Sequence, residues 1–171
     1  MYFFRVVLVL AVAFFGGCGY TPSSKFARNV VGQKVSTQVI ISSTDPQNTV
    51  LIKDAVDSAI IKSFQSSLTD QADADTHLVI SLQGVGYSPI QYDNNGYVIG
   101  YRMTTSLGIT MTSNGITKSY SVSGTYDFSI EANAIISDQT RFEAIKYSAA
   151  KAISSFVAQV AAQGAKGQKD E

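Results

Sequence analysis

The sequence predicts an α+β fold in the order β-α-β-β-β-α, with two helices packed on one face of a four-stranded, mixed or antiparallel sheet. Residues 50–68 and 138–163 place apolar side chains three and four positions apart, which is the spacing of one helix face. Residues 97–111 and 116–130 alternate apolar and polar side chains, as strands with one buried face do. Two helical stripes and one apolar sheet face are buried together when both helices cover the same side of the sheet.

The elements before the long hairpin follow from local patterns. Residues 35–41 are rich in β-branched side chains and are expected to form the first strand. The first helix follows at 50–68, and a second strand begins at about residue 78. The apolar alternation of this strand shifts phase across Gly84, which predicts a β-bulge. Residues 93–96, Asp-Asn-Asn-Gly, are typical of the turn of a hairpin.

The hairpin over residues 97–130 is the clearest element of the sequence. Its turn is Asn114-Gly115, a pair that favours the tight turns of two-residue hairpin loops. Each arm has about fifteen residues, whereas strands usually have five or six. Gly100, Gly108 and Gly124 are expected to bend or bulge such long arms.

The second helix is expected over residues 138–163, with Gly164 as its C-terminal cap. Residues 164–171 are rich in Gly, Lys and Gln and are expected to be a flexible tail. Residues 33–163 then form a single domain, a size at which one hydrophobic core is usual. The polar residues 18–32 are expected to be a tether ahead of it.

The first seventeen residues predict a secretory signal peptide. Arg5 precedes the apolar run 6–15, which small residues end, and the run is shorter than the roughly 20 residues of a membrane-spanning helix. Gly16-Gly17-Cys18 resembles the lipobox of bacterial lipoproteins, although Phe15 stands where Leu is usual. That resemblance implies cleavage before Cys18 and lipid attachment to its thiol. Because Cys18 is the only cysteine, no disulfide can form within the chain.

The composition excludes several classes of protein. The chain has 13 basic and 13 acidic residues, and this balance argues against a nucleic-acid binder. His77 is the only histidine and Cys18 the only cysteine, so we predict no metal site and place His77 on the surface. We found no nucleotide-binding or catalytic motif, and therefore expect neither a cofactor nor an enzyme.

The tyrosines of the hairpin allow two interpretations. Tyr97, Tyr101, Tyr120 and Tyr126 could form a sugar-binding platform. Their positions are in phase with the apolar residues of the two arms, however, so packing in the core is the expected role.

The start Gly17-Cys18-Gly19-Tyr20, the element order and the strand that contains Gly100-Tyr101-Arg102 resemble the lipopolysaccharide-assembly lipoprotein family, LptE. This resemblance implies a plug inside the outer-membrane barrel LptD that helps the barrel assemble and assists lipopolysaccharide delivery to the cell surface. Gly19 is not the Asp that commonly retains lipoproteins in the inner membrane, which implies the periplasmic face of the outer membrane. In the family, basic residues near strand ends have been linked to lipopolysaccharide, so Arg102 and Lys118 are the candidates here.

The polar face of the hairpin, within residues 104–129, is rich in Ser and Thr and fits a polar barrel lumen. An ordinary solvated sheet face explains the same composition. A second hypothesis is a periplasmic lipoprotein that activates an envelope enzyme or accompanies an ABC transporter. Copurification with a barrel or with a synthase or transporter distinguishes the two.

Overall fold

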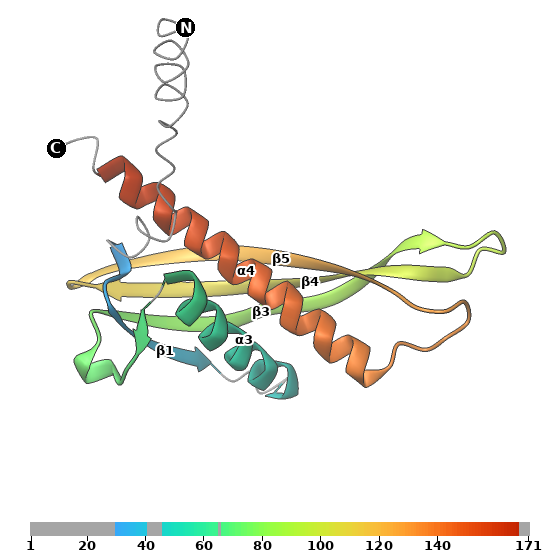
Figure 1. Ribbon diagram of the computed structural model, residues 1–171, viewed down its shortest axis with the longest axis horizontal. Helices are drawn as coiled ribbons and strands as arrows, with labels where there is room; N and C mark the ends of the chain where they lie inside the picture. The colour runs from blue at the N-terminus through green and yellow to red at the C-terminus, as the bar shows by residue number, and fades with distance from the viewer. Residues whose placement is uncertain (1–29, 41–45, 65, 168–171) are drawn as a thin grey trace, which may run out of the picture.

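The computed structural model describes residues 30–40, 46–64 and 66–167. In this part of the chain one five-stranded sheet has the strand order β2-β1-β3-β4-β5. Both long helices lie on one side of the sheet, and α4 crosses β5 and β4 diagonally (Figure 1). The elements in chain order are β1 Lys34–Ile40, α3 Pro46–Phe64, β2 Ser67–Leu68, the 3-10 turn Gln71–Asp73, β3 Thr76–Tyr92, β4 Val98–Ser113, β5 Ile116–Ser129 and α4 Asp138–Gly167.

The α+β class and the mixed sheet are confirmed, but the predicted number of four strands is wrong. The additional strand, β2, has two residues and runs parallel to β1. The predicted first helix extended to residue 68, whereas α3 ends at Phe64 and the chain then turns to pair with β1. Ser67 N donates to Gln33 O at 2.9 Å and Thr69 N donates to Val35 O at 3.0 Å. A two-residue strand has no periodicity that a sequence pattern could show.

The pairing of the other strands explains why the sheet is mixed. β1 is parallel to β3, which the connection through α3 allows, while β3, β4 and β5 form an antiparallel meander. The β3–β4 register shifts between Leu82 and Gly84, which confirms the bulge predicted at Gly84. Asn114 and Gly115 both have positive φ angles, 49° and 75°, as a two-residue hairpin turn of type I′ requires.

Gly108 and Gly124 provide space for neighbouring groups. Both lie where the β4–β5 register is continuous. A Cβ at Gly108 would come within 2.8 Å of the Gln83 side chain, and a Cβ at Gly124 would come within 2.1 Å of the Ser148 carbonyl oxygen. The second value means that the backbone of α4 packs directly on β5 at Gly124.

The core lies between the two helices and the apolar face of the sheet. Its largest fully buried side chains include Ile52 and Ile60 of α3, Leu78 and Ile80 of β3, Met103, Leu107 and Ile109 of β4, and Ile145, Ile153 and Phe156 of α4. The alternation predicted for the hairpin is confirmed, because its apolar phase faces the helices from Met103 to Met111 and from Tyr120 to Val122.

Two predicted boundaries differ from the structure. Val31 is fully buried, so the folded unit begins before the boundary predicted at residue 33. α4 passes through Gly164 and ends at Gly167, beyond the end predicted at Gln163. A glycine inside a helix costs only about 1 kcal/mol, and Gln163 and Ala165, its two neighbours, favour the helix. Residues 168–171 and most of the predicted tether lie outside the described residues.

The start of β1 is held by one aspartate. The Asp75 carboxylate accepts backbone hydrogen bonds from Lys34 N at 2.9 Å and Gln33 N at 2.8 Å, and these bonds lower the pKa of Asp75. Gly32 has a φ of +83°, and a Cβ there would lie 2.6 Å from that of Asp75. The start of the first strand therefore depends on a backbone conformation at Gly32 that only glycine adopts easily.

Candidate functional site

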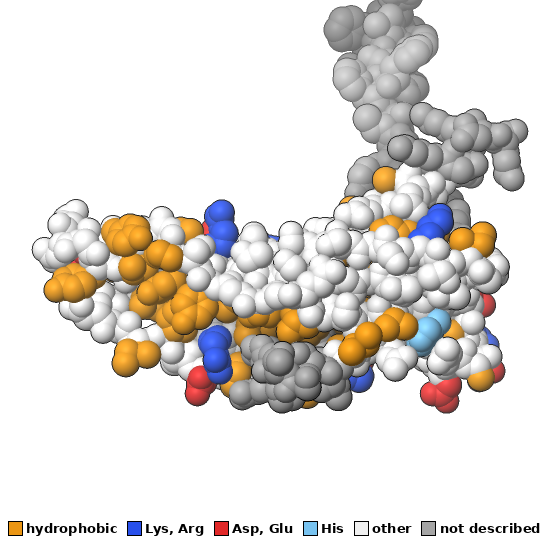
Figure 2. Space-filling model, turned by 180° about the vertical axis from the view of Figure 1, so that it is seen from behind, with side chains coloured by type: hydrophobic (Ala, Val, Ile, Leu, Met, Phe, Trp, Pro, Cys, Tyr) orange, Lys and Arg blue, Asp and Glu red, His pale blue; other side chains and the backbone are white. Residues whose placement is uncertain are grey.

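The outer face of the β4–β5 hairpin, on the side away from the helices, is almost entirely hydroxyl. From Thr104 to the turn and back to Thr125, its outward positions are all Ser or Thr except for Gly108, and we call them the hydroxyl face. They are Thr104, Ser106, Thr110 and Thr112 on β4 and Thr117, Ser119, Ser121, Ser123 and Thr125 on β5. The β5 members are exposed and the β4 members are half-buried. Figure 2 shows the corresponding breadth of uncharged surface.

Hydrogen bonds link some of these side chains. Thr112 and Thr117 lie opposite each other, with their hydroxyl oxygens 3.1 Å apart. Ser121 Oγ donates to Gln83 Oε1 at 3.1 Å, and the Gln83 side chain reaches it across Gly108. Donors and acceptors of this kind can exchange their partners for those of another polar surface without the cost of removing a charge from water.

Arg102 and Asp127 mark the end of the hydroxyl face. The Arg102 Nε and Nη2 atoms donate to the two Asp127 carboxylate oxygens, each at 2.7 Å. The hydrogen bonds from Arg102 lower the pKa of Asp127, and those to Asp127 raise the pKa of Arg102. The two side chains are about half exposed, at 48 % and 47 %. The ion pair occupies two N–H donors of Arg102 and offsets its charge, so Asp127 competes with a phosphate for this side chain.

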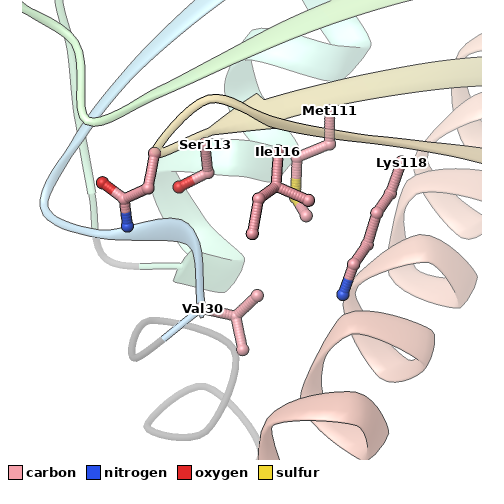
Figure 3. Close-up of a pocket in the computed structure, with 6 residues that line it drawn as sticks. Val30, Met111, Ser113, Ile116 and Lys118 are labelled. Atoms are coloured by element: carbon pink, nitrogen blue, oxygen red, sulfur yellow. The ribbon is translucent and has the colours of Figure 1, made fainter.

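Lys118 lies on the other face of the sheet, beside the end of α4. It is opposite Met111, and its Nζ donates to Gln163 Oε1 at 3.4 Å. The Tyr120 hydroxyl donates to the same oxygen at 3.0 Å, and burial raises the pKa of Tyr120. Lys118 borders a pocket of about 150 Å³ at the β4–β5 turn, with Val30, Met111 and Ile116 around it (Figure 3).

The structure does not bring Arg102 and Lys118 together. Their side chains are on opposite faces of the sheet, and Asp127, opposite Arg102, is nine residues from Lys118 along β5. Nine residues of strand span roughly 30 Å. One phosphate group therefore cannot contact both side chains.

His77 has a structural partner, as its Nδ1 lies 2.6 Å from the Ser36 hydroxyl oxygen. Within residues 30–40, 46–64 and 66–167, no three His, Cys, Asp or Glu side chains gather as metal ligands would. None of the helices in this part of the chain is long and apolar enough to span a membrane. Cys18, the predicted site of lipid attachment, and the predicted signal peptide lie outside the described residues.

The far end of the β3–β4 hairpin carries a surface that the sequence analysis missed. Tyr87, Tyr92 and Tyr97 are 53 %, 56 % and 47 % exposed, and Ile90 is 45 % exposed; we call these four residues the aromatic tip. The tip continues into half-buried Tyr101, whose ring packs against Tyr87 with 5.6 Å between ring centroids. Figure 2 shows hydrophobic side chains gathered toward this end of the molecule.

The core role predicted for four tyrosines is confirmed for Tyr120, which is 8 % exposed, and only in part for half-buried Tyr101 and Tyr126. It is wrong for Tyr97. The reason is length, because the hairpin extends past the helices that cover the rest of the sheet (Figure 1). The fifteen-residue arms contained this information, since no helix of ordinary length covers roughly 50 Å of strand.

The fold is that of small bacterial lipoproteins. A putative lipoprotein from Caulobacter crescentus is similar, with a TM-score of 0.53 and 9 % identity over 83 % of this chain and 98 % of that one. Uncharacterized lipoprotein B from Nitrosomonas europaea has a TM-score of 0.50 and 11 % identity over 81 % of this chain and 88 % of that one. At such identities the likeness concerns the fold alone. No curated protein matches the sequence.

The sequence itself identifies the family. The model of the family described as "LptE: Lipopolysaccharide-assembly" matches residues 36–160. This range runs from β1 to the last third of α4 and covers most of the chain. The protein belongs to the LptE family, which confirms the resemblance seen in the sequence. Its function lies in lipopolysaccharide assembly, in a family of envelope lipoproteins that are not enzymes.

Proposed function

We propose that this protein is anchored by lipid on Cys18 at the periplasmic face of the outer membrane and sits as a plug in the lumen of the barrel LptD. There it helps the barrel assemble and assists the insertion of lipopolysaccharide at the cell surface. The observation that carries the proposal is the hydroxyl face, which has no charged side chain between Thr104 and Thr125.

The chemistry of the hydroxyl face suits the wall of a barrel. Barrel lumens are polar, so a plug must present hydrogen-bonding groups. A charged side chain sealed against such a wall loses its water, and the cost is several kcal/mol per ion unless a partner charge meets it. Ser and Thr avoid this cost, because each hydroxyl both donates and accepts a hydrogen bond.

The shape of the molecule supports the same arrangement. The described chain begins at one end of the sheet, and the aromatic tip lies at the other (Figure 1). The twelve residues from Cys18 to Val30 span at most about 40 Å when fully extended. A plug that is anchored at the end opposite the aromatic tip would enter the barrel with the aromatic tip first.

The test is a charge placed on the hydroxyl face. Ser119 is exposed, so Ser119→Glu should fold normally, but the glutamate would lose its water against the lumen wall. We expect Ser119→Glu to recover much less barrel than wild type when the tagged protein is purified from detergent-solubilised envelopes. Gln159→Glu adds the same charge at an exposed position of α4 and should recover the normal amount.

Equal recovery of the barrel with the two variants would show that the hydroxyl face is ordinary solvated surface. Wild-type protein that copurifies with a synthase or an inner-membrane transporter, and with no barrel, would contradict the whole proposal. The anchor has its own test, because Cys18→Ser should move the protein from the membrane fraction to the soluble periplasm. Retention in the membrane would mean that contacts other than the lipid hold it there.

A further inference from the structure

A groove of about 250 Å³ runs between α3 and α4, in the helix layer. Its lining residues form one stripe on each helix, because Ser58 and Lys62 are four residues apart on α3, and Lys146, Ala150 and Ser154 are four residues apart on α4. Side chains at this spacing lie above one another on one helix face. The groove is therefore a regular consequence of two helices that pack side by side.

The floor and the rim of this groove differ in chemistry. Ala55 is buried and Ala150 is half-buried, and both leave the floor shallow and apolar. Ser58 and Ser154 are exposed at the rim, where Ser154 Oγ donates to Ala150 O at 3.0 Å and can still accept a hydrogen bond. The lining thus offers hydrogen bonds at the mouth and apolar contact beneath, which is the pattern of a ligand site.

Two lysines give the groove its charge. Lys62 and Lys146 line it from opposite helices, and none of the described residues that line it is acidic. None of the ion pairs found among the described residues includes either lysine. Glu143, one helical turn from Lys146, accepts a hydrogen bond from Gln139. An anion bound in the groove could accept charge-assisted hydrogen bonds from both ammonium groups.

Tyr147 also lines the groove, and its ring is held in place by another aromatic ring. Its ring stacks on that of Tyr126, with centroids 4.9 Å apart and an angle of 30° between the planes. Even so, 49 % of Tyr147 remains exposed beside the groove. A held aromatic ring provides rigid contact area with both apolar and polar character, at little cost in conformational entropy.

We propose that this groove binds the phosphate-bearing sugar headgroup of lipopolysaccharide, with Lys62 and Lys146 on the phosphate and Tyr147 beside the sugar. The choice of lipopolysaccharide as the ligand rests on the proposed function, whereas the existence of a binding site rests on the residues that line the groove. The volume is below the roughly 300–1,000 Å³ of pockets that enclose a drug-sized ligand, so it fits part of a headgroup and no acyl chains. The helices and the hydroxyl face lie on opposite sides of the sheet, so a bound headgroup leaves that face free.

The absence of tryptophan from the chain makes a direct measurement possible. Tyr147→Trp places a single tryptophan at the groove of the full-length protein, purified from membranes in detergent. Titration with lipopolysaccharide should change its emission until the site is saturated. In this background, Lys62→Gln with Lys146→Gln should weaken binding about tenfold or more, because both phosphate contacts lose their charge.

The matched control is Lys151→Gln, which removes the charge of an exposed lysine of α4 that does not line the groove. It should bind within about twofold of the parent protein, since exposed charges at a distance are screened. Unchanged binding by the double lysine variant would overturn the assignment. An equal response to phosphatidylglycerol vesicles or to inorganic phosphate would overturn the choice of a lipopolysaccharide headgroup.

Barrel binding and headgroup binding use different faces of the protein and can be measured separately. The groove lies away from the hydroxyl face, so the double lysine variant should still copurify with the barrel in the amount seen for wild type. A barrel complex that forms normally, together with lipopolysaccharide binding that ignores both lysines, would reject the groove alone.

Discussion

Gly124 is the position at which the packing of α4 on the sheet can be tested most directly. A Cβ there would lie 2.1 Å from Ser148 O and 2.3 Å from Ala152 N, both of which are backbone atoms of α4. Ordinary contact begins at 3.4 Å, so Gly124→Ala requires a movement of 3.4 − 2.1 = 1.3 Å. A helix backbone cannot yield by rotating a side chain, so α4 as a whole must move away from β5.

The loss of stability expected for Gly124→Ala has two contributions. Overpacking of a close contact typically costs about 1–3 kcal/mol, and the upper part of that range applies because the contact is with backbone. The same movement strains a buried hydrogen bond between Thr105 and Ser148, whose hydroxyl oxygens are 2.7 Å apart; Thr105 lies opposite Gly124 on β4. Loss of such a bond adds about 1 kcal/mol. We expect Gly124→Ala to destabilise the fold by about 3–4 kcal/mol.

Equilibrium unfolding in urea measures this value. If the free energy of unfolding falls by about 2 kcal/mol per molar urea, the urea concentration at the midpoint of unfolding should fall by roughly 1.5–2 M. Gly86→Ala is the matched control, because a Cβ at Gly86 on β3 has no atom within 4 Å. It should leave the midpoint unchanged or raise it slightly, since alanine restricts the unfolded chain. If Gly124→Ala unfolds at the same urea concentration as Gly86→Ala, the close approach of α4 to β5 is wrong.

Three further predictions concern acid stability, the ion pair and the aromatic tip. Backbone hydrogen bonds lower the pKa of Asp75, so the stability that this carboxylate contributes is present above its unfolded pKa of about 3.9 and is lost as pH falls through the folded value. The stability of wild type should therefore fall more steeply below about pH 4 than that of Asp75→Asn, and parallel urea titration curves would contradict this. If Arg102 contacts lipopolysaccharide, Asp127→Asn should strengthen binding by freeing the guanidinium, and Arg102→Gln should weaken it; equal affinities would exclude Arg102 from the contact. Tyr92→Ser with Tyr97→Ser should lower the thermal unfolding temperature only slightly, because about half of each side chain is already exposed, yet clearly lower the recovery of the barrel; normal recovery would show that the aromatic tip touches no partner.

Much of the candidate site could be predicted because its chemistry is local in the sequence. The alternation along residues 97–130 placed the hydroxyl face on one side of the hairpin, and the pairing of β4 with β5 has that arrangement. Side chains alternate between the faces of any strand, so this result needs no knowledge of tertiary contacts. The same pattern placed Arg102 and Lys118 on neighbouring strands, whereas their position on opposite faces of the sheet was found from the pairing of β4 with β5.

The groove between the helices could not be predicted in this way. Lys62 and Lys146 are 84 positions apart in the sequence, and each resembles an ordinary exposed lysine of an amphipathic helix. Only the packing of α3 beside α4 brings them to one groove. The partner of Arg102 is a related case, since Asp127 is 25 residues away and is found opposite Arg102 only once the register is known.

The sequence by itself determined the α+β class, the long hairpin with its turn at Asn114-Gly115, and the resemblance to the LptE family. These depend on periodicity, turn chemistry and short motifs, each of which lies within a few neighbouring residues. The tertiary structure alone decided that β2 joins the sheet as a fifth strand, that Gly124 receives the backbone of α4, and that Lys62 and Lys146 line one groove. Each of these features is a contact between segments that are remote in the chain. Such contacts depend on how the elements pack, which no local sequence pattern specifies.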